Sequence, residues 1–320
     1  MVFRKIGMNL SFSHLPVLLD EVIEGLNIKE DGIYVDGTVG GAGHSREILK
    51  RIPKGHLIGI DQDQAALNKA REVLSEVGDN FTLVHENYRN FDKVLKELGY
   101  DKVDGILLDI GVSSHQLDTV DRGFSYQFDG PLDMRMNQEQ TLTAKTVVNT
   151  YSERELTQIL REYGEERWAK RIAEFIVKAR TDKPIESTGE LVDIIKAAIP
   201  AGARKEGPHP ATRTFQAIRI EVNQELNVLR ESIEKMVDHL KLHGRLAIIS
   251  FHSLEDRIVK NTYRDLYRDC ICPPEFPVCQ CDKVREIDII TRKPVTAREE
   301  ELKQNHRARS AKLRIAEKIV

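Results

Sequence analysis

The residues at positions 31–45 constrain the fold more than any other part of the chain. A short apolar run ends in Asp36, four glycines follow within seven residues, and a helix-like pattern begins at His44. This order of strand, tight turn and helix is typical of the cofactor-binding corner of an open α/β sheet. Glycine lets the backbone pass close to a ligand, and the start of a helix offers free N–H groups.

A second predicted strand, 57–60, ends in Asp61, where a carboxylate can accept hydrogen bonds from the two hydroxyls of a ribose. The glycines do not follow the G-x-G-x-x-G spacing of dinucleotide sites, because Arg46 occupies the last position. The pattern therefore favours a smaller nucleoside cofactor, such as S-adenosylmethionine. The alternative is a glycine-rich loop that binds no ligand.

Strand-like runs alternate with helical patterns through the first third of the chain, which predicts a parallel sheet. The runs lie at 33–36, 57–61, 81–85 and 103–109, with helices at 64–77 and 91–98. The next buried strand, 244–251, follows only after about 135 residues, far more than an ordinary crossover needs. The gap must therefore hold an inserted unit.

The inserted unit is predicted to be helical. Capping boxes at Ser152 and Ser187 precede apolar stripes, and one long helix is expected from 214 to 242. The predicted fold is α/β, with a Rossmann-like domain at 1–111 and 214–320 and an inserted helical substrate-recognition domain at 112–213. The segment 311–316 is expected to form a last strand.

Composition limits the classes of protein. The net charge of −3 excludes a protein that binds nucleic acid through its overall charge, so any such surface must be local. No apolar run approaches the ~18 residues of a membrane span, and polar residues interrupt the N-terminal segment. We expect a soluble, cytoplasmic protein without a membrane partner.

Asp109 ends the fourth predicted strand, where ligands bind in this topology. It is our candidate for the reacting centre, and the alternative is a cap for the next turn. The loop that follows places aromatic residues between two arginines, Arg122 and Arg135. Phe124 and its aromatic neighbours could stack a flipped base while the arginines hold phosphates, or the loop could pack on its own rings.

Three further features are candidates. Arg213 precedes the predicted long helix and could contact RNA, and His252 follows the fifth strand, where Ser253 and Asp256 are expected to cap a helix. A basic tail at 305–314 is, taken alone, a solvated face. All four cysteines fall within twelve residues and could hold a tetrahedral zinc ion, although reduced free thiols are favoured because zinc sites more often use C-x-x-C: Cys270, Cys272, Cys279 and Cys281.

Five motifs in order resemble the ribosomal RNA small-subunit methyltransferase H family, from His14 to about Lys318. They are Asp-Gly-Thr with Gly-His-Ser, Gly-Ile-Leu-Leu-Asp-Ile-Gly-Val-Ser-Ser, Asp-Gly-Pro-Leu-Asp-Met-Arg-Met, His-Pro-Ala-Thr-Arg-Thr-Phe-Gln-Ala and Ser-Phe-His-Ser-Leu-Glu-Asp-Arg-Ile-Val-Lys. The resemblance implies a class I S-adenosylmethionine-dependent methyltransferase with an inserted helical domain. Its implied reaction is methylation of N4 of a decoding-centre cytidine in 16S rRNA, within the small ribosomal subunit.

The resemblance also implies a cofactor pocket. Its residues would be Ala42, Gly43 and His44, then Asp61 at the ribose, with Tyr88, Asp109 and Gln116 completing it. Ala42 replaces a frequent glycine, Tyr88 a frequent phenylalanine and His306 a common proline. The cysteine segment lies in the most variable part of the family.

Transfer to an amine needs alignment and an acceptor for its N–H, but no metal. Asp109 is the candidate acceptor; the alternatives are a backbone carbonyl or a side chain of the insert. Two other functions compete, namely a methyltransferase of the same fold that acts on protein or a small molecule, and a non-catalytic ribosome assembly factor. The sequence predicts no oligomeric state.

Overall fold

The computed structural model describes residues 16–205, 207, 209–273, 275–276 and 278–320. Residues 1–15 of the predicted first domain, including His14, lie outside the described part. Within that part, none of the helices combines the length and apolar character that crossing a membrane requires.

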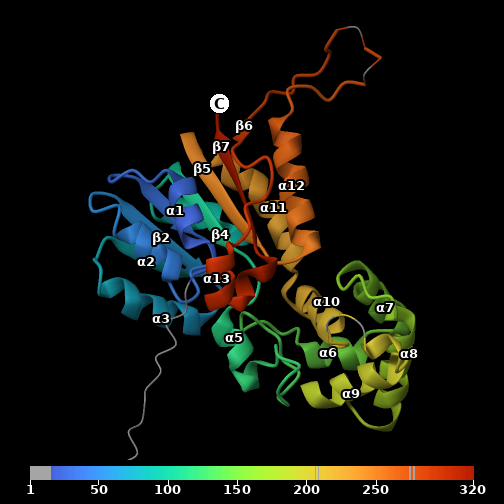
Figure 1. Cartoon of the computed structure of the whole chain (residues 1–320). Helices are drawn as coiled ribbons and strands as arrows, with labels where there is room; N and C mark the ends of the chain where they lie inside the picture. The colour runs from blue at the N-terminus through green and yellow to red at the C-terminus, as the bar shows by residue number, and fades with distance from the viewer. Residues whose placement is uncertain (1–15, 206, 208, 274, 277) are drawn as a thin grey trace, which may run out of the picture.

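A seven-stranded sheet forms the centre of the first domain (Figure 1), and its strand order is β3-β2-β1-β4-β5-β7-β6. The first five strands are parallel, whereas β7 runs antiparallel to both β5 and β6. The α/β fold class is confirmed. The strands are β1 Ile33–Asp36, β2 His56–Asp61, β3 Phe81–His85, β4 Val103–Asp109, β5 Leu240–Ser250, β6 Ile287–Ile289 and β7 Lys312–Lys318.

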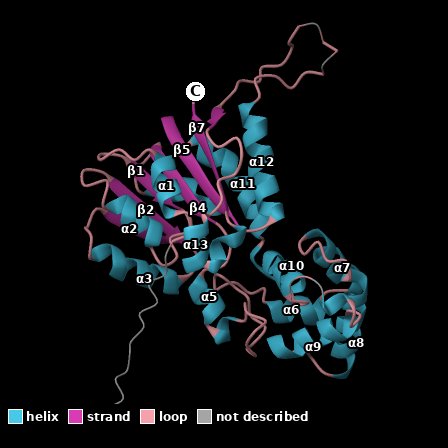
Figure 2. Cartoon of the chain, in the orientation of Figure 1, coloured by secondary structure: helices cyan, strands magenta, loops and turns pink. Residues whose placement is uncertain are grey.

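Both faces of the sheet are buried, because helices pack on each of them. Successive residues of a strand point to opposite sides and so enter different cores. In β4, Ile106 and Leu108 pack in one apolar core and Leu107 in the other. Helices cover both faces (Figure 2). One core contains residues of α1 Leu19–Leu26, α2 Gly43–Leu49 and α3 Gln64–Ser75, and the other contains residues of α4 Phe91–Glu97, α11 Glu225–Asp238 and α12 Ser253–Tyr267.

The inserted unit has a core of its own and stands beside the sheet (Figure 1). Both predicted capping boxes are confirmed, with Ser152 and Ser187 each paired to a glutamate three residues on. A small final helix, α13 Glu299–Gln304, lies outside this unit. The elements of the insert are α5 Ser114–Asp118, η2 Val120–Arg122, α6 Ala144–Thr150, α7 Glu153–Glu162, α8 Ala169–Asp182, α9 Thr188–Ala198, η3 Ala203–Lys205 and α10 Thr212–Asn223.

The single helix predicted over 214–242 is wrong. The chain breaks at Gln224, whose φ of 51° is left-handed, so that α10 ends there and α11 begins in a new direction. Phe215 and Ile218 of α10 pack in the insert core, whereas α11 packs on the sheet. We therefore propose that the inserted unit ends at Gln224 rather than at 213.

One predicted helix cap is wrong, and one strand was not predicted. The helix after the fifth strand is capped by His252, whose ring accepts from the Glu255 N–H, while Glu255 accepts from the His252 N–H. Asp256, the predicted cap partner, instead pairs with Arg314 of β7 at 2.7 Å. Strand β6 was not predicted, because its three residues give too short an apolar pattern.

Candidate active site

Three carboxylates stand at the carboxyl ends of adjacent strands. Asp36 ends β1, Asp61 ends β2 and Asp109 ends β4. Strand β1 pairs with β2 on one side and β4 on the other, so the strand order reverses here. Ligands of open α/β sheets bind at such a reversal. The three acids therefore mark the candidate active site.

The glycine corner after β1 is tightly fitted. A Cβ at Gly37 would lie 2.6 Å from Leu108 Cδ2 and 3.2 Å from Tyr88 Cβ. Ala42 is buried at the N-cap of α2 with a φ of 62°, a left-handed conformation that costs an alanine about 1–2 kcal/mol. A Cβ at Gly43 would meet Pro16 Cγ at 2.4 Å, so this glycine is needed for packing against the preceding segment.

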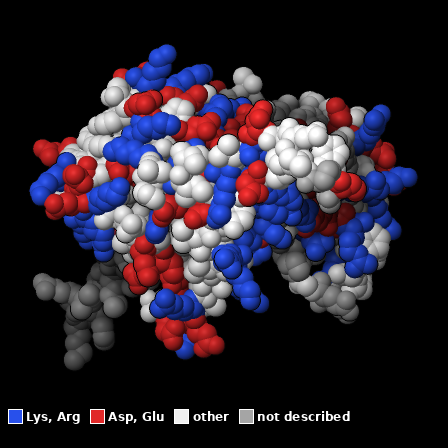
Figure 3. All heavy atoms as spheres, turned by 90° about the horizontal axis from the view of Figure 1, so that it is seen from above, with Lys and Arg blue, Asp and Glu red and all other residues white. Residues whose placement is uncertain are grey.

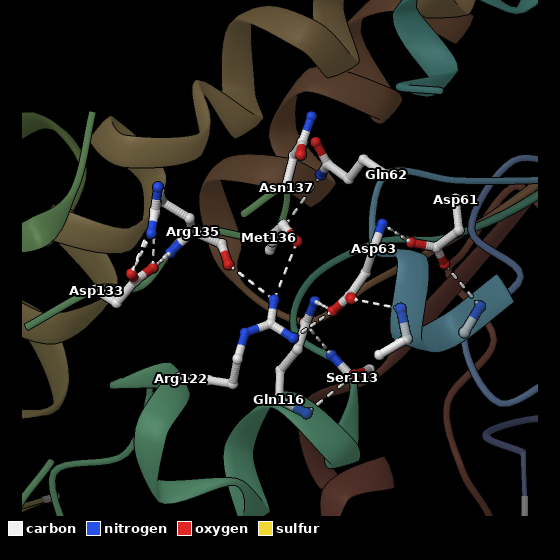
Figure 4. Close-up of polar contacts among 12 residues, drawn as sticks. Asp61, Gln62, Asp63, Ser113, Gln116, Arg122, Asp133, Arg135, Met136 and Asn137 are labelled. Carbon is white, nitrogen blue, oxygen red and sulfur yellow. Dashed lines mark hydrogen bonds and ion pairs between the residues drawn. The ribbon is translucent and has the colours of Figure 1, made fainter. Parts of the chain in front are cut away.

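Asp61 is held by backbone amides. Its Oδ2 accepts from the Gly40 N–H at 2.8 Å and its Oδ1 from the Asp63 N–H at 2.9 Å (Figure 4). Each carboxylate oxygen can accept a second hydrogen bond, so two acceptors remain side by side. Burial raises the pKa of Asp61 to about 6, against the opposing effect of the two amide bonds.

Asp109 has an unsatisfied acceptor. Its backbone N–H donates to Thr38 Oγ1 at 2.6 Å, but its buried Oδ1 has no hydrogen-bond partner within the described chain. Burial, reinforced by the charges of Asp36 and Glu255, raises the pKa of Asp109 to about 8. The protein without a ligand therefore holds this carboxyl mostly protonated at pH 7, and a cation beside it would favour the charged form.

His44 lies beside the other oxygen of Asp109 without a hydrogen bond to it. Its Nε2 lies 2.9 Å from the Val17 carbonyl, which only accepts, so Nε2 carries the proton. Its Nδ1, left with a lone pair, lies 3.8 Å from Asp109 Oδ2. Burial lowers the pKa of His44 to about 4, so the ring is neutral at pH 7 and cannot neutralise Asp109.

Tyr88 and Gln116 differ in the contacts that hold their side chains: Tyr88 packs against apolar residues, whereas the amide of Gln116 is hydrogen-bonded at both ends. Tyr88 begins η1 Tyr88–Asn90 and packs against one of the two sheet cores. Gln116 is buried and uses both ends of its amide: Nε2 donates to Asp63 Oδ2 at 2.9 Å and Oε1 accepts from the Ser113 N–H at 3.0 Å. Gln116 thus joins α5 to the residues that follow β2. Its place in the cofactor pocket stays a prediction.

A match with a known protein family shows to which family the chain belongs. Residues 11–319 match the model of the MraW methylase family. The chain belongs to this family. It is 58% identical over 311 residues to ribosomal RNA small subunit methyltransferase H of Clostridioides difficile, covering 97% of this chain and 100% of that one. It is 60% identical over 314 residues to the protein of the same name from Lachnospira eligens, covering 98% and 100%.

Among solved structures, an rRNA methylase from Streptococcus thermophilus is a looser match. Its TM-score is 0.42 at 14% identity, covering 100% of this chain and 99% of that one. As a member of the MraW methylase family, the chain is an S-adenosylmethionine-dependent methyltransferase. The site's residues fit this cofactor, because Asp61 offers paired acceptors for ribose hydroxyls and Asp109 an unpartnered acid for its cationic part.

A buried polar network joins the methylase sheet to the insert (Figure 4). Arg122 lies 2.7 Å from Asp63 through Nη1, and its Nη2 donates to the carbonyls of Arg135 and Met136. Asn223 of α10 accepts from the Met136 N–H and donates to the Met134 carbonyl. The sequence analysis missed Asp63 and Asn223. Asp63 could have been found as the N-cap of α3, whereas nothing local in the sequence marks Asn223.

The expected RNA-contacting residues lie in different environments. Arg122 is only 4% exposed and bound as just described. Its Nε has no partner among the described residues, but this atom is buried and faces no solvent through which a phosphate could approach. Phe124 is buried in the insert core, and Arg135 is bidentate to Asp133 and donates to two carbonyls. We therefore assign these three to holding the fold. Arg213 is exposed, with one Nη1 bond to the Glu165 carbonyl at 3.0 Å.

Arg213 lies at the same edge of the molecule as the acids. The Glu165 carboxylate accepts from Ser253 Oγ at 2.9 Å and pairs with Arg257 at 3.3 Å, both at the start of α12. Helix α12 follows directly on β5, so this contact brings Arg213 towards the carboxyl end of the sheet. On the face seen from above in Figure 3, which is not the edge that carries the acids, basic and acidic side chains are interspersed.

Proposed function

We propose that this enzyme methylates the exocyclic N4 amine of a cytidine in 16S rRNA, within the small ribosomal subunit and hence in the cytoplasm. Ribosomal RNA as the substrate is supported by the name of the two relatives, ribosomal RNA small subunit methyltransferase H. The observation that carries the chemistry is Asp109, an acid with an unpartnered oxygen at the reversal of strand order. An amine nucleophile needs such an acceptor for its N–H.

Bound S-adenosylmethionine supplies a methyl group activated on a positively charged sulfonium. We propose that Asp61 holds its ribose, that Ala42, Gly43 and His44 line the corner beside it, and that Tyr88 packs against it. Asp109 would be ionised by the neighbouring positive charge and would then accept the N–H of the cytosine amine. Because the protonated form of Asp109 dominates in the free enzyme, this carboxyl would release its proton to solvent when a cation binds beside it, and would then be the base.

The inserted unit is proposed to recognise the RNA, with Arg213 as a phosphate contact. Its exposed guanidinium stands on α10, which lies between the insert core and the break at Gln224. Phosphate contacts position a nucleic acid without specifying its sequence. Arg213 would therefore help to place the target strand, while the cytidine is selected at the acids.

Nucleoside mass spectrometry tests this proposal. Small subunits and 16S rRNA lacking the modification are incubated with the enzyme and labelled cofactor, and the rRNA is digested and analysed. N4-methylcytidine at one position is expected. Label in ribosomal protein or a small molecule, or at another base, would contradict the substrate assigned here. Cofactor binding without transfer to either RNA form would instead support an assembly factor.

A further inference from the structure

We propose that Cys270, Cys272, Cys279 and Cys281 bind one zinc ion in a closed tetrahedral site, which methyl transfer does not require. The four sulfur atoms lie within 4.8 Å of one another. The Sγ distances are 3.5 Å between Cys270 and Cys279, 3.5 Å between Cys279 and Cys281, 3.8 Å between Cys270 and Cys281, and 4.0 Å between Cys272 and Cys279.

These spacings match a single metal ion. Four sulfurs bound at about 2.3 Å to one zinc ion lie about 3.8 Å apart at the corners of a tetrahedron. A disulfide would bring two sulfurs to about 2.05 Å, and all four cysteines are free. Burial does not explain the convergence, since Cys270 and Cys279 are exposed. Thiols also attract one another only weakly, so four protonated thiols have little reason to gather.

Backbone amides provide a second, independent observation. The N–H groups of Ile271, Cys272 and Gln280 donate to the sulfurs of Cys281, Cys270 and Cys272 at 3.4, 3.4 and 3.3 Å. Hydrogen bonds from the surroundings to metal ligands orient them and stabilise their negative charge. Three amides aimed at three sulfurs therefore suit thiolates that share one dication.

The loop that carries the cysteines needs an external source of order. It joins α12 to β6, projects from the body of the molecule (Figure 1), and has no helix or strand in its described residues. Its apolar side chains form no core, since Ile271, Phe276 and Val278 are 65%, 47% and 70% exposed. Four protein ligands leave no open position on zinc, so the ion would be structural and would order this loop.

The cysteine cluster is also remote from the active site. Helix α12 begins just after β5, at the edge that carries the acids, and its 15 residues span about 22 Å. The cysteines follow its far end. Loss of the metal is therefore expected to loosen the loop without changing cofactor affinity.

The test measures the metal in full-length protein purified without added metal or chelator. About one zinc per chain is expected, released as a mercurial reagent titrates the thiols. Because the chain has four cysteines in all, every thiol counted belongs to the cluster. Less than about a tenth of an equivalent of zinc, or iron in its place, would overturn the proposal.

Variants then locate the ion. The double variant Cys279→Ser and Cys281→Ser should lose zinc, fail to give the visible bands of tetrahedral cobalt thiolate, and be cut faster by protease within the loop. Gln280→Ala is the matched control, because it changes a side chain between two ligands and keeps the backbone amide. Zinc retained by the double variant would refute these ligands. If that variant does not fold, the wild-type cobalt spectrum decides.

Discussion

The acids at the sheet edge and the loop that contains Arg122, Phe124 and Arg135 are both dense in functional residue types, yet the structure treats them oppositely. Asp61 and Asp109 retain acceptors that the described chain does not use, whereas the guanidinium groups of Arg122 and Arg135 are bound by their own neighbours, apart from the buried Nε of Arg122. The difference teaches that unused bonding capacity on a side chain that solvent reaches, rather than residue type, distinguishes a binding group from a structural one: the side chain of Asp109 is 25% exposed and that of Arg122 only 5%. Arg213 belongs with the acids in this respect, since it is exposed with a single hydrogen bond in the described chain.

The largest effect should come from Asp109→Asn. The amide is nearly isosteric but cannot act as an anionic acceptor, and help from a general base is worth about 10²–10⁴-fold in rate. Single-turnover methylation at saturating cofactor and RNA should slow by about that factor. A rate within about threefold of wild type, which corresponds to ~0.65 kcal/mol, would exclude Asp109 as the base.

Arg122→Ala should be the most destabilising change in the arginine loop. The substitution removes the ion-pair partner of the buried Asp63 and the donor to the carbonyls of Arg135 and Met136. Breaking a buried ion pair costs about 3–5 kcal/mol of stability. Denaturant unfolding would measure the loss. Arg213→Ala is the contrasting control, because an exposed side chain with one such bond should cost under about 0.5 kcal/mol while lowering RNA methylation. If both variants were equally stable and equally poor with RNA, the comparison drawn here would fail.

Asp109 should also govern stability as the pH rises. Its pKa is raised from 3.8 to about 8, so the folded protein keeps a proton that the unfolded chain releases above about pH 4. Asp109 therefore does not lower the free energy of unfolding below about pH 4, and lowers it increasingly as the pH rises to about 8. Asp109→Asn should raise stability by about 2–4 kcal/mol at pH 8 without cofactor, allowing for its 25% exposed side chain, and by little at pH 4. A gain independent of pH, seen in melting curves, would show that burial does not protonate Asp109.

The smallest of these effects is expected at the ribose. Asp61→Ala should weaken S-adenosylmethionine by about 1.5–3 kcal/mol, or roughly ten- to hundredfold, measured by calorimetry. Asp61→Asn keeps one oxygen acceptor and should lose less. Unchanged affinity in a folded Asp61→Ala protein would remove the carboxylate from the cofactor site.

Local patterns predicted much of this protein. The alternating strands, both capping boxes and the acids at the ends of β1, β2 and β4 follow from periodicity and from hydrogen bonds between near neighbours. The prediction of one long helix was wrong because its apolar spacing continues through Gln224. The chain changes direction there because α10 packs in one core and α11 in another. No pattern in the neighbouring residues predicts that change of direction.

By itself, the sequence determined the α/β class, the family and the glycine corner at which we propose that the cofactor binds, since each depends on residues close together in the chain or on whole ordered motifs. The tertiary structure alone decided which charged groups are bound by other residues of the chain and which keep acceptors or donors for a ligand. Asp63 and Arg122 are 59 residues apart, and a sequence does not reveal whether such a pair meets. Burial then fixes the outcome, because a charge without water must find a partner, lose its proton or await a ligand.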